Sequence, residues 1–124
     1  MPKNIFLSFS MEDKNLVELF RGQAKNKNND LEFNDHSVKE PFENAWKTNV
    51  AAKITRCSTV ICLIGLRTWE SDAVAWEIEE SIRQKKKIFG VKLNTTTFLY
   101  PKTITSNNIK VVEWNFDQIM KEIL

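Results

Sequence analysis

The feature that most constrains the fold of this chain is a continuous apolar run, Thr59-Val60-Ile61-Cys62-Leu63-Ile64, which is rich in β-branched side chains and ends at Gly65. A run of this kind is typical of a central strand in a parallel sheet, because helices cover such a strand on both faces. The run therefore predicts a buried strand with helices packed on either side of it.

Shorter strand patterns and amphipathic helical patterns alternate on both sides of this run. We expect strands at residues 4–9, 31–33, 59–64, 88–93 and 109–114, and helices after Ser10, around Trp46 to Ile54, from Val74 to Ile82 and from Phe116 to Ile123. Such alternation implies a parallel sheet with right-handed crossovers. The predicted fold is a flavodoxin-like, doubly wound α/β fold with five parallel strands in the order 2-1-3-4-5, formed by a single domain over residues 1–124.

The sequence also predicts where some of these elements begin and end. Ser10 and Asp13 have the spacing of a capping box at the start of the first helix. The third helix is expected to end in Lys85-Lys86-Lys87, where cations favour the helix dipole. Residues 34–44 are predicted to form a long loop, and residues 94–108 a polar connection.

The overall composition excludes several classes of partner. The 124 residues are 42% hydrophobic, and 18 basic against 16 acidic side chains leave a net charge of only +2. This balance argues against nucleic-acid or membrane binding. No apolar run is long enough to span a bilayer, and Met1 to Asn4 lead directly into a strand pattern without a secretory signal. We expect a cytoplasmic protein.

The low numbers of cysteine, histidine and glycine residues exclude most classes of catalytic site. Cys57 and Cys62 lie in or beside an apolar run, which is typical of reduced, buried thiols, and His36 is the one histidine. We therefore expect neither a metal site nor a bound cofactor. The three glycines are too far apart for a phosphate-binding loop or a dinucleotide fingerprint: Gly22, Gly65 and Gly90.

Ligands of doubly wound sheets bind beyond the carboxyl ends of the strands, at the switch point between strands 1 and 3. This rule places residues 8–13, 33–46 and 65–77 around one crevice. A phosphorelay receiver shares the topology, but it needs an aspartate at the end of strand 3, where this chain has Gly65 and Leu66. A flavodoxin relative is a further alternative, which predicts bound flavin in the purified protein.

Four blocks of sequence carry a more specific resemblance. They are Ile5-Phe6-Leu7-Ser8-Phe9-Ser10-x-Glu12-Asp13, Leu31-Glu32-Phe33-x-Asp35-x-Ser37-x-Lys39-Glu40-Pro41-Phe42, Val60 to Gly65, and Thr68-Trp69-x-Ser71-x-x-Val74-x-Trp76-Glu77-Ile78-Glu79-x-Ser81. Together they extend over residues 3 to about 93. Because the four blocks occur in this order, the chain resembles the TIR-like family. The similarity is to the bacterial branch that includes the TIR subunit of Thoeris anti-phage systems.

The resemblance implies NAD+ cleavage between nicotinamide and ribose by one glutamate, which by alignment is Glu77. The chemistry is consistent with one carboxylate, because nicotinamide departs neutral and leaves an oxocarbenium-like ribose. Without the resemblance, Glu77, Glu79 and Glu80 would each be explained by the favourable dipole of a helix N-terminus. Many TIR enzymes have a tryptophan four residues before the glutamate, where this chain has Ala73.

The resemblance also implies a set of substrate-binding residues around Glu77. Ser8 and Phe9 end the first strand, and Trp46, Trp69 and Trp76 offer rings that could replace the tryptophan missing at Ala73. The residues expected to bind the substrate NAD+ are Ser8, Phe9, Asp35, Lys39, Phe42, Trp46 and Trp76.

Two functions of different classes follow from the resemblance. The first is an NAD+ glycohydrolase or ADP-ribosyl cyclase, whose product signals to a separate effector protein in bacterial immunity, with self-association on activation as a further expectation. The second is a TIR interaction module without catalysis, in which exposed aromatic residues such as Trp46 or Trp114 anchor partners. Whether water or an internal nucleophile attacks the ribose stays open at this point.

Overall fold

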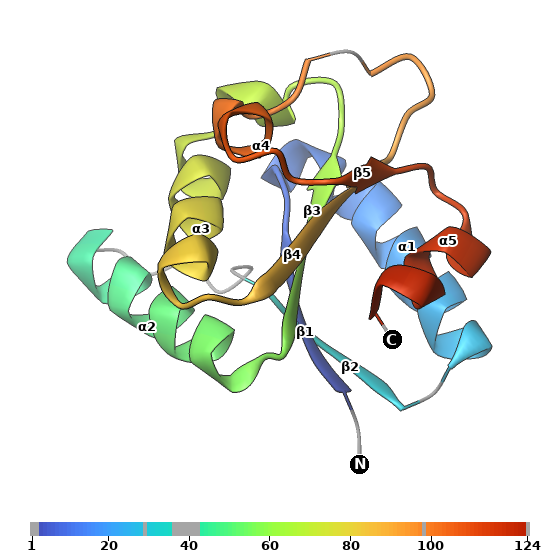
Figure 1. Cartoon of the computed structure of the whole chain (residues 1–124), viewed down its shortest axis with the longest axis horizontal. Coiled ribbons are helices and arrows are strands. Elements are labelled where there is room, and N and C mark those ends of the chain that lie inside the picture. The colour runs from blue at the N-terminus through green and yellow to red at the C-terminus, as the bar shows by residue number, and fades with distance from the viewer. Residues whose placement is uncertain (1–2, 29, 36–42, 98, 124) are drawn as a thin grey trace.

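The computed structural model contains a five-stranded parallel sheet with helices on both faces (Figure 1). It describes residues 3–28, 30–35, 43–97 and 99–123. The strands run in the order β2-β1-β3-β4-β5, and each neighbouring pair is parallel. The predicted fold class and strand order are therefore confirmed. The strands are β1 (Lys3–Ser8), β2 (Leu31–Asp35), β3 (Thr59–Ile64), β4 (Lys87–Lys92) and β5 (Val111–Val112).

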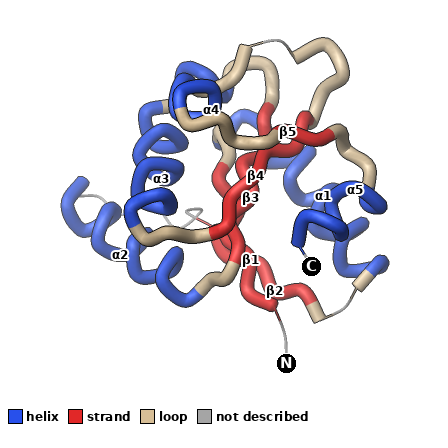
Figure 2. Tube along the Cα trace, in the orientation of Figure 1, coloured by secondary structure: helices blue, strands red, loops and turns tan. Residues whose placement is uncertain are grey.

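The helices form one layer on each side of this sheet, as Figures 1 and 2 show. One layer consists of α1 (Lys14–Lys27) and α5 (Phe116–Ile123). The other consists of α2 (Glu43–Arg56), α3 (Asp72–Arg83) and α4 (Lys102–Ser106). Short 3-10 turns follow β1 and β3, namely η1 (Met11–Asp13) and η2 (Thr68–Glu70). In the described ranges, no helix has both the length and the apolarity needed to cross a membrane.

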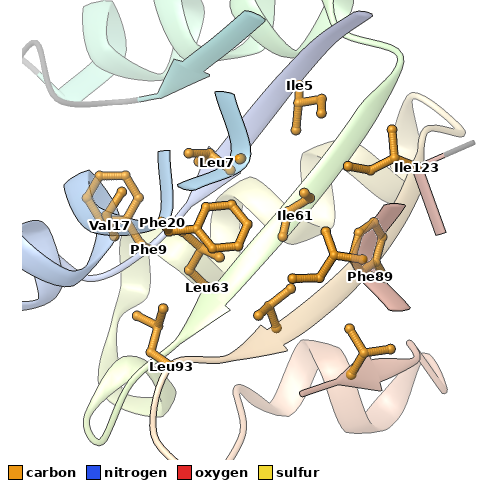
Figure 3. Close-up of a cluster of buried hydrophobic side chains, with 14 of the residues drawn as sticks. Ile5, Leu7, Phe9, Val17, Phe20, Ile61, Leu63, Phe89, Leu93 and Ile123 are labelled. Carbon is orange, nitrogen blue, oxygen red and sulfur yellow. The ribbon is translucent and has the colours of Figure 1, made fainter. Parts of the chain in front are cut away.

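The alternation of side chains along β1 decides which layer each residue meets. Ile5 and Leu7 belong to the core beneath α1 and α5 (Figure 3). Phe6 packs on the other side, beneath α2. Every residue of β3 is buried, which explains its continuous apolar sequence. Ser8 follows Phe6 in this alternation, so its side chain faces the α2 and α3 layer.

Phe20 of α1 is the centre of an aromatic cluster that joins α1 to β2 and α5. Its ring lies 6.4 Å from that of Phe33, 6.0 Å from that of Trp114 and 5.3 Å from that of Phe116, measured between centroids. The indole N–H of Trp114 also donates a 3.1 Å hydrogen bond to Gln23 Oε1. Trp114 is thus packed and half-buried, not the exposed interface anchor considered from the sequence.

Two predicted helix boundaries are wrong. Neither Ser10 nor Asp13 makes a side-chain capping hydrogen bond, because the η1 turn intervenes before α1. The third helix, α3, ends at Arg83 and not in the lysines. Lys85 adopts a φ of 59° there, while the N–H groups of Lys85 and Lys86 bond back to Ile82 and Ser81. These bonds form a Schellman motif, after which Lys87 begins β4.

The observed connections and the last strand also differ in length from those predicted. The polar stretch at 94–108 contains the five-residue helix α4, which docks through Ile104, 1% exposed, onto the core beside Ile64. The last strand covers Val111 and Val112 only, not residues 109–114. Of the long loop predicted at 34–44, the ends belong to β2 and α2, and residues 36–42 lie outside the described ranges.

Candidate active site

Glu77 lies in the second turn of α3 with its side chain fully buried. Its Oε1 accepts a 2.6 Å hydrogen bond from the Oγ of Ser8, which is itself fully buried at the end of β1. The contact joins a strand end to the helix that follows β3, next to the switch point of the sheet. A carboxylate held in this way has a fixed position and little access to bulk water.

Cys62 of β3 is the neighbour of Ser8 in the sheet register. Complete burial, and secondarily the charge of Glu77, raise the pKa of this thiol far above its ordinary range. The thiol is therefore neutral and not a candidate nucleophile. Both Cys57 and Cys62 are free and buried, as the sequence predicted.

The three glutamates of α3 occupy different surroundings. Ser71 caps the helix by accepting a 3.2 Å hydrogen bond from the Val74 N–H, so no glutamate is needed for that role. Glu79 is exposed. Burial raises the pKa of the Glu80 carboxyl, but hydrogen bonds from Arg83 and Gln84 outweigh it and hold the pKa below its ordinary value. Only Glu77 is directed into the protein toward β1.

A second buried carboxylate lies at the same edge of the sheet. Asp13, 8% exposed, accepts a 3.4 Å hydrogen bond from Thr68 Oγ1, and that oxygen accepts a 2.8 Å bond from the N–H of Gly65. Burial and the nearby charge of Glu12 raise the pKa of Asp13, and the Thr68 hydroxyl opposes them. The contact links the segment after β1 to the segment after β3.

Two of the predicted substrate-binding residues lie on the opposite face of the sheet from Glu77. Asp35 is in register with Leu7, and its carboxylate forms an ion pair with Arg21 of α1. Phe9, 2% exposed, packs in the core beneath α1 and α5 (Figure 3). The structure therefore brings Ser8 to Glu77 but leaves Phe9 and Asp35 apart from them.

The remaining predicted residues lie partly in α2 and α3 and partly outside the described ranges. Trp46 and Trp76 pack together, with ring centroids 5.4 Å apart, at the outer side of α3 beside Ala73. Trp69 is 45% exposed on η2. Lys39, Phe42 and His36 lie outside the described residues.

Asp13 was predicted only as part of a capping box, and Thr68 and Arg21 were given no role. Each takes part in a contact between residues far apart along the chain, and no local pattern marks such a pair. An acidic pair at Glu12 and Asp13, placed just after a predicted strand, was the one available signal for Asp13. Within the described ranges, no group of three or more His, Cys, Asp or Glu side chains is arranged to hold a metal ion.

The fold and the site define an α/β domain of the doubly wound class with a buried glutamate at the edge where such sheets bind ligands. The family model of the TIR-like domain of Thoeris protein ThsB matches residues 6–97, and the chain belongs to this family. The matched residues include Ser8, Asp13 and Glu77. Membership indicates a role in anti-phage defence. A comparison with curated proteins found no match.

Proposed function

We propose that this protein cleaves NAD+ at the bond between nicotinamide and ribose, with Glu77 as the catalytic carboxylate. The observation that carries the proposal is the buried Ser8–Glu77 contact of 2.6 Å at the ligand-binding edge of the sheet. Membership of the TIR-like family supports it, because some members of that family are NAD+-cleaving enzymes.

The reaction requires stabilisation of positive charge and no general acid. The nicotinamide ring of NAD+ is cationic, so it takes the bonding electron pair and leaves as a neutral molecule. The ribose carbon then carries oxocarbenium character, which a nearby carboxylate stabilises in glycosidases. Glu77 supplies that charge, and its burial strengthens the interaction because the local dielectric is low.

Ser8 is the positioning residue in this proposal. Its hydroxyl donates a hydrogen bond to one oxygen of the Glu77 carboxylate and so holds that carboxylate in one orientation. Preorganisation of this kind lowers the cost of reorganising the site when charge develops. We expect Ser8→Ala to reduce turnover by about tenfold and to destabilise the protein by about 1–3 kcal/mol, because a buried carboxylate oxygen loses its donor.

The product is proposed to be ADP-ribose or a cyclised isomer that signals to a separate effector protein. Water attacks the ribose carbon in the first case. In the second, a hydroxyl of the same molecule attacks it and loses its proton, or an adenine ring nitrogen attacks it and the exocyclic amino group then loses a proton. Either route requires that water be excluded. Mass spectrometry distinguishes the two outcomes, because the cyclic product lacks one water.

The test is release of nicotinamide from NAD+ by purified wild-type protein, Glu77→Gln and Glu80→Gln, over a range of protein concentrations. The two substitutions remove the same charge from the same helix. We expect Glu77→Gln to reduce release on the order of 10²- to 10³-fold and Glu80→Gln to leave it nearly unchanged.

Equal release by wild-type protein and Glu77→Gln contradicts the proposal. Absence of release at every concentration favours the alternative, an interaction module without catalysis. The aromatic residues first considered as anchors for that alternative do not support it, because Trp46 packs on Trp76 and Trp114 is bonded to Gln23.

A further inference from the structure

A hollow of about 460 Å³ lies between α2 and α3, apart from the Ser8–Glu77 contact. Its volume is within the range of small-molecule sites, roughly 300–1,000 Å³. Glu77 does not line it, because that side chain is buried beneath the helix. The lining residues are Trp46 and Lys47 from α2 and Asp72, Ala73, Ala75, Trp76 and Glu79 from α3.

Two tryptophan rings form one wall of the hollow. The rings of Trp46 and Trp76 are tilted by 52° with centroids 5.4 Å apart. Both also pack against the buried cluster around Phe6, Val50 and Ile54, so their positions are fixed by the core. The short side chains of Ala73 and Ala75 keep the hollow open beside the rings.

The hollow carries a negative balance of charge. Asp72 and Glu79 are exposed at its rim, seven residues apart on α3 and hence about 10 Å apart along the helix axis. Among the described lining residues, one ammonium group accompanies these two carboxylates, that of Lys47, whose Nζ lies 5.9 Å from the centroid of the Trp76 ring. A cation of this chain thus already lies over the ring.

We propose that this hollow binds a small organic cation of the quaternary-ammonium type, which displaces Lys47 from the face of Trp76. Aromatic faces attract cations, and tryptophan attracts them most strongly. The lysine side chain has four flexible methylene groups, so its ammonium can move away from the ring when a ligand binds. The rim carboxylates then balance the charge of the ligand.

The apolar part of the lining suits a quaternary cation. The side-chain hydrogen-bond acceptors of the lining are the two rim carboxylates, while the wall and floor are indole and methyl groups. A quaternary ammonium presents alkyl groups to this wall and has no N–H donor that needs an acceptor there. Trp46 and Trp76 are also among the residues predicted from the sequence to bind NAD+, but the proposal does not require NAD+ cleavage, because choline binding is measured without NAD+.

The experiment is a titration of ¹⁵N-labelled full-length protein with choline, observed through the indole N–H signals of the four tryptophans. The neutral analogue 3,3-dimethyl-1-butanol, which has the same shape, is the control, and sodium chloride holds the ionic strength constant. We expect saturable shifts at Trp46 and Trp76 with choline at millimolar concentration, and no saturation with the analogue. Trp114, on the opposite face of the sheet, serves as the internal reference.

Variants test the assigned roles. Lys47→Met should tighten choline binding about fivefold, because it removes the competing cation, and Trp76→Leu should weaken it about tenfold. The double variant Asp72→Asn, Glu79→Gln changes exposed side chains only and should weaken binding several-fold while the protein remains folded. Shifts that do not saturate, equal binding of the neutral analogue, or unchanged affinity in this double variant would overturn the proposal.

Discussion

The carboxylate of Asp13 occupies the space where a side chain at position 65 would begin: a Cβ built on Gly65 would lie 2.2 Å from Asp13 Oδ2. Gly65 is therefore required by a close approach, and its backbone N–H in turn bonds to Thr68. The contact joins the segment after β1 to the segment that leads into α3, and so helps to set where Glu77 lies.

Gly65→Ala should destabilise the protein by about 1–3 kcal/mol, because the added methyl group must displace a buried carboxylate. Urea unfolding measures the change. Asp13→Ala in the same chain vacates the space, so the double variant should lose less stability than the sum of the two single variants. A Gly65→Ala protein as stable as the wild type would show that Asp13 moves aside at no cost.

Asp13→Asn should make stability less dependent on pH. Burial and Glu12 raise the pKa of Asp13 in the folded state above its ordinary value of 3.8, so the folded protein binds this proton more tightly than the unfolded chain. The stabilisation from that proton is complete below the ordinary pKa and is lost as pH rises through the folded pKa. Asparagine keeps an acceptor for Thr68, so the stability of the variant should rise relative to that of the wild type as pH increases from the ordinary pKa of 3.8 through the raised pKa of the folded state. A constant difference across this range would contradict the assignment.

Asp35→Ala should reveal a structural role for this carboxylate. Its side chain is 7% exposed in the ion pair with Arg21, which is 27% exposed. We expect a loss of about 1–3 kcal/mol in the free energy of unfolding, because the Arg21 guanidinium is left half-buried without its partner. Arg21→Met in addition should recover part of the loss. If Asp35 instead serves the substrate, the change will appear in the KM for NAD+ and not in stability.

The main strands and helices could be predicted from the sequence because they depend on strong local patterns, and their alternation then predicts the strand order. The run from Thr59 to Ile64 and the stripe of Val74, Ile78 and Ile82 each identify one element without reference to the rest of the chain. The short helix α4 could not be found in this way, because it is five residues long and Ile104 is its one buried residue. At Lys85 a left-handed turn forms without the glycine that usually marks it.

The candidate site could be predicted only in part. Ser8 and Glu77 were each named, but their contact spans 69 positions and depends on how the crossovers pack. Strand alternation was the signal that separates Ser8 from its neighbours: Leu7 faces α1, and Asp35, in register with it, shares that face. Phe9, just beyond the strand, also turns to the α1 layer.

The most direct test of the central claim separates NAD+ binding from NAD+ turnover in Glu77→Gln. A group that stabilises the ribosyl cation acts in the transition state, so its loss should lower kcat and leave binding of the ground state nearly intact. We predict a fall in kcat on the order of 10²- to 10³-fold, with the Kd for NAD+ within about threefold of the wild-type value. An unchanged kcat with a weakened Kd would contradict the account, because Glu77 would then hold the substrate without acting on the reaction.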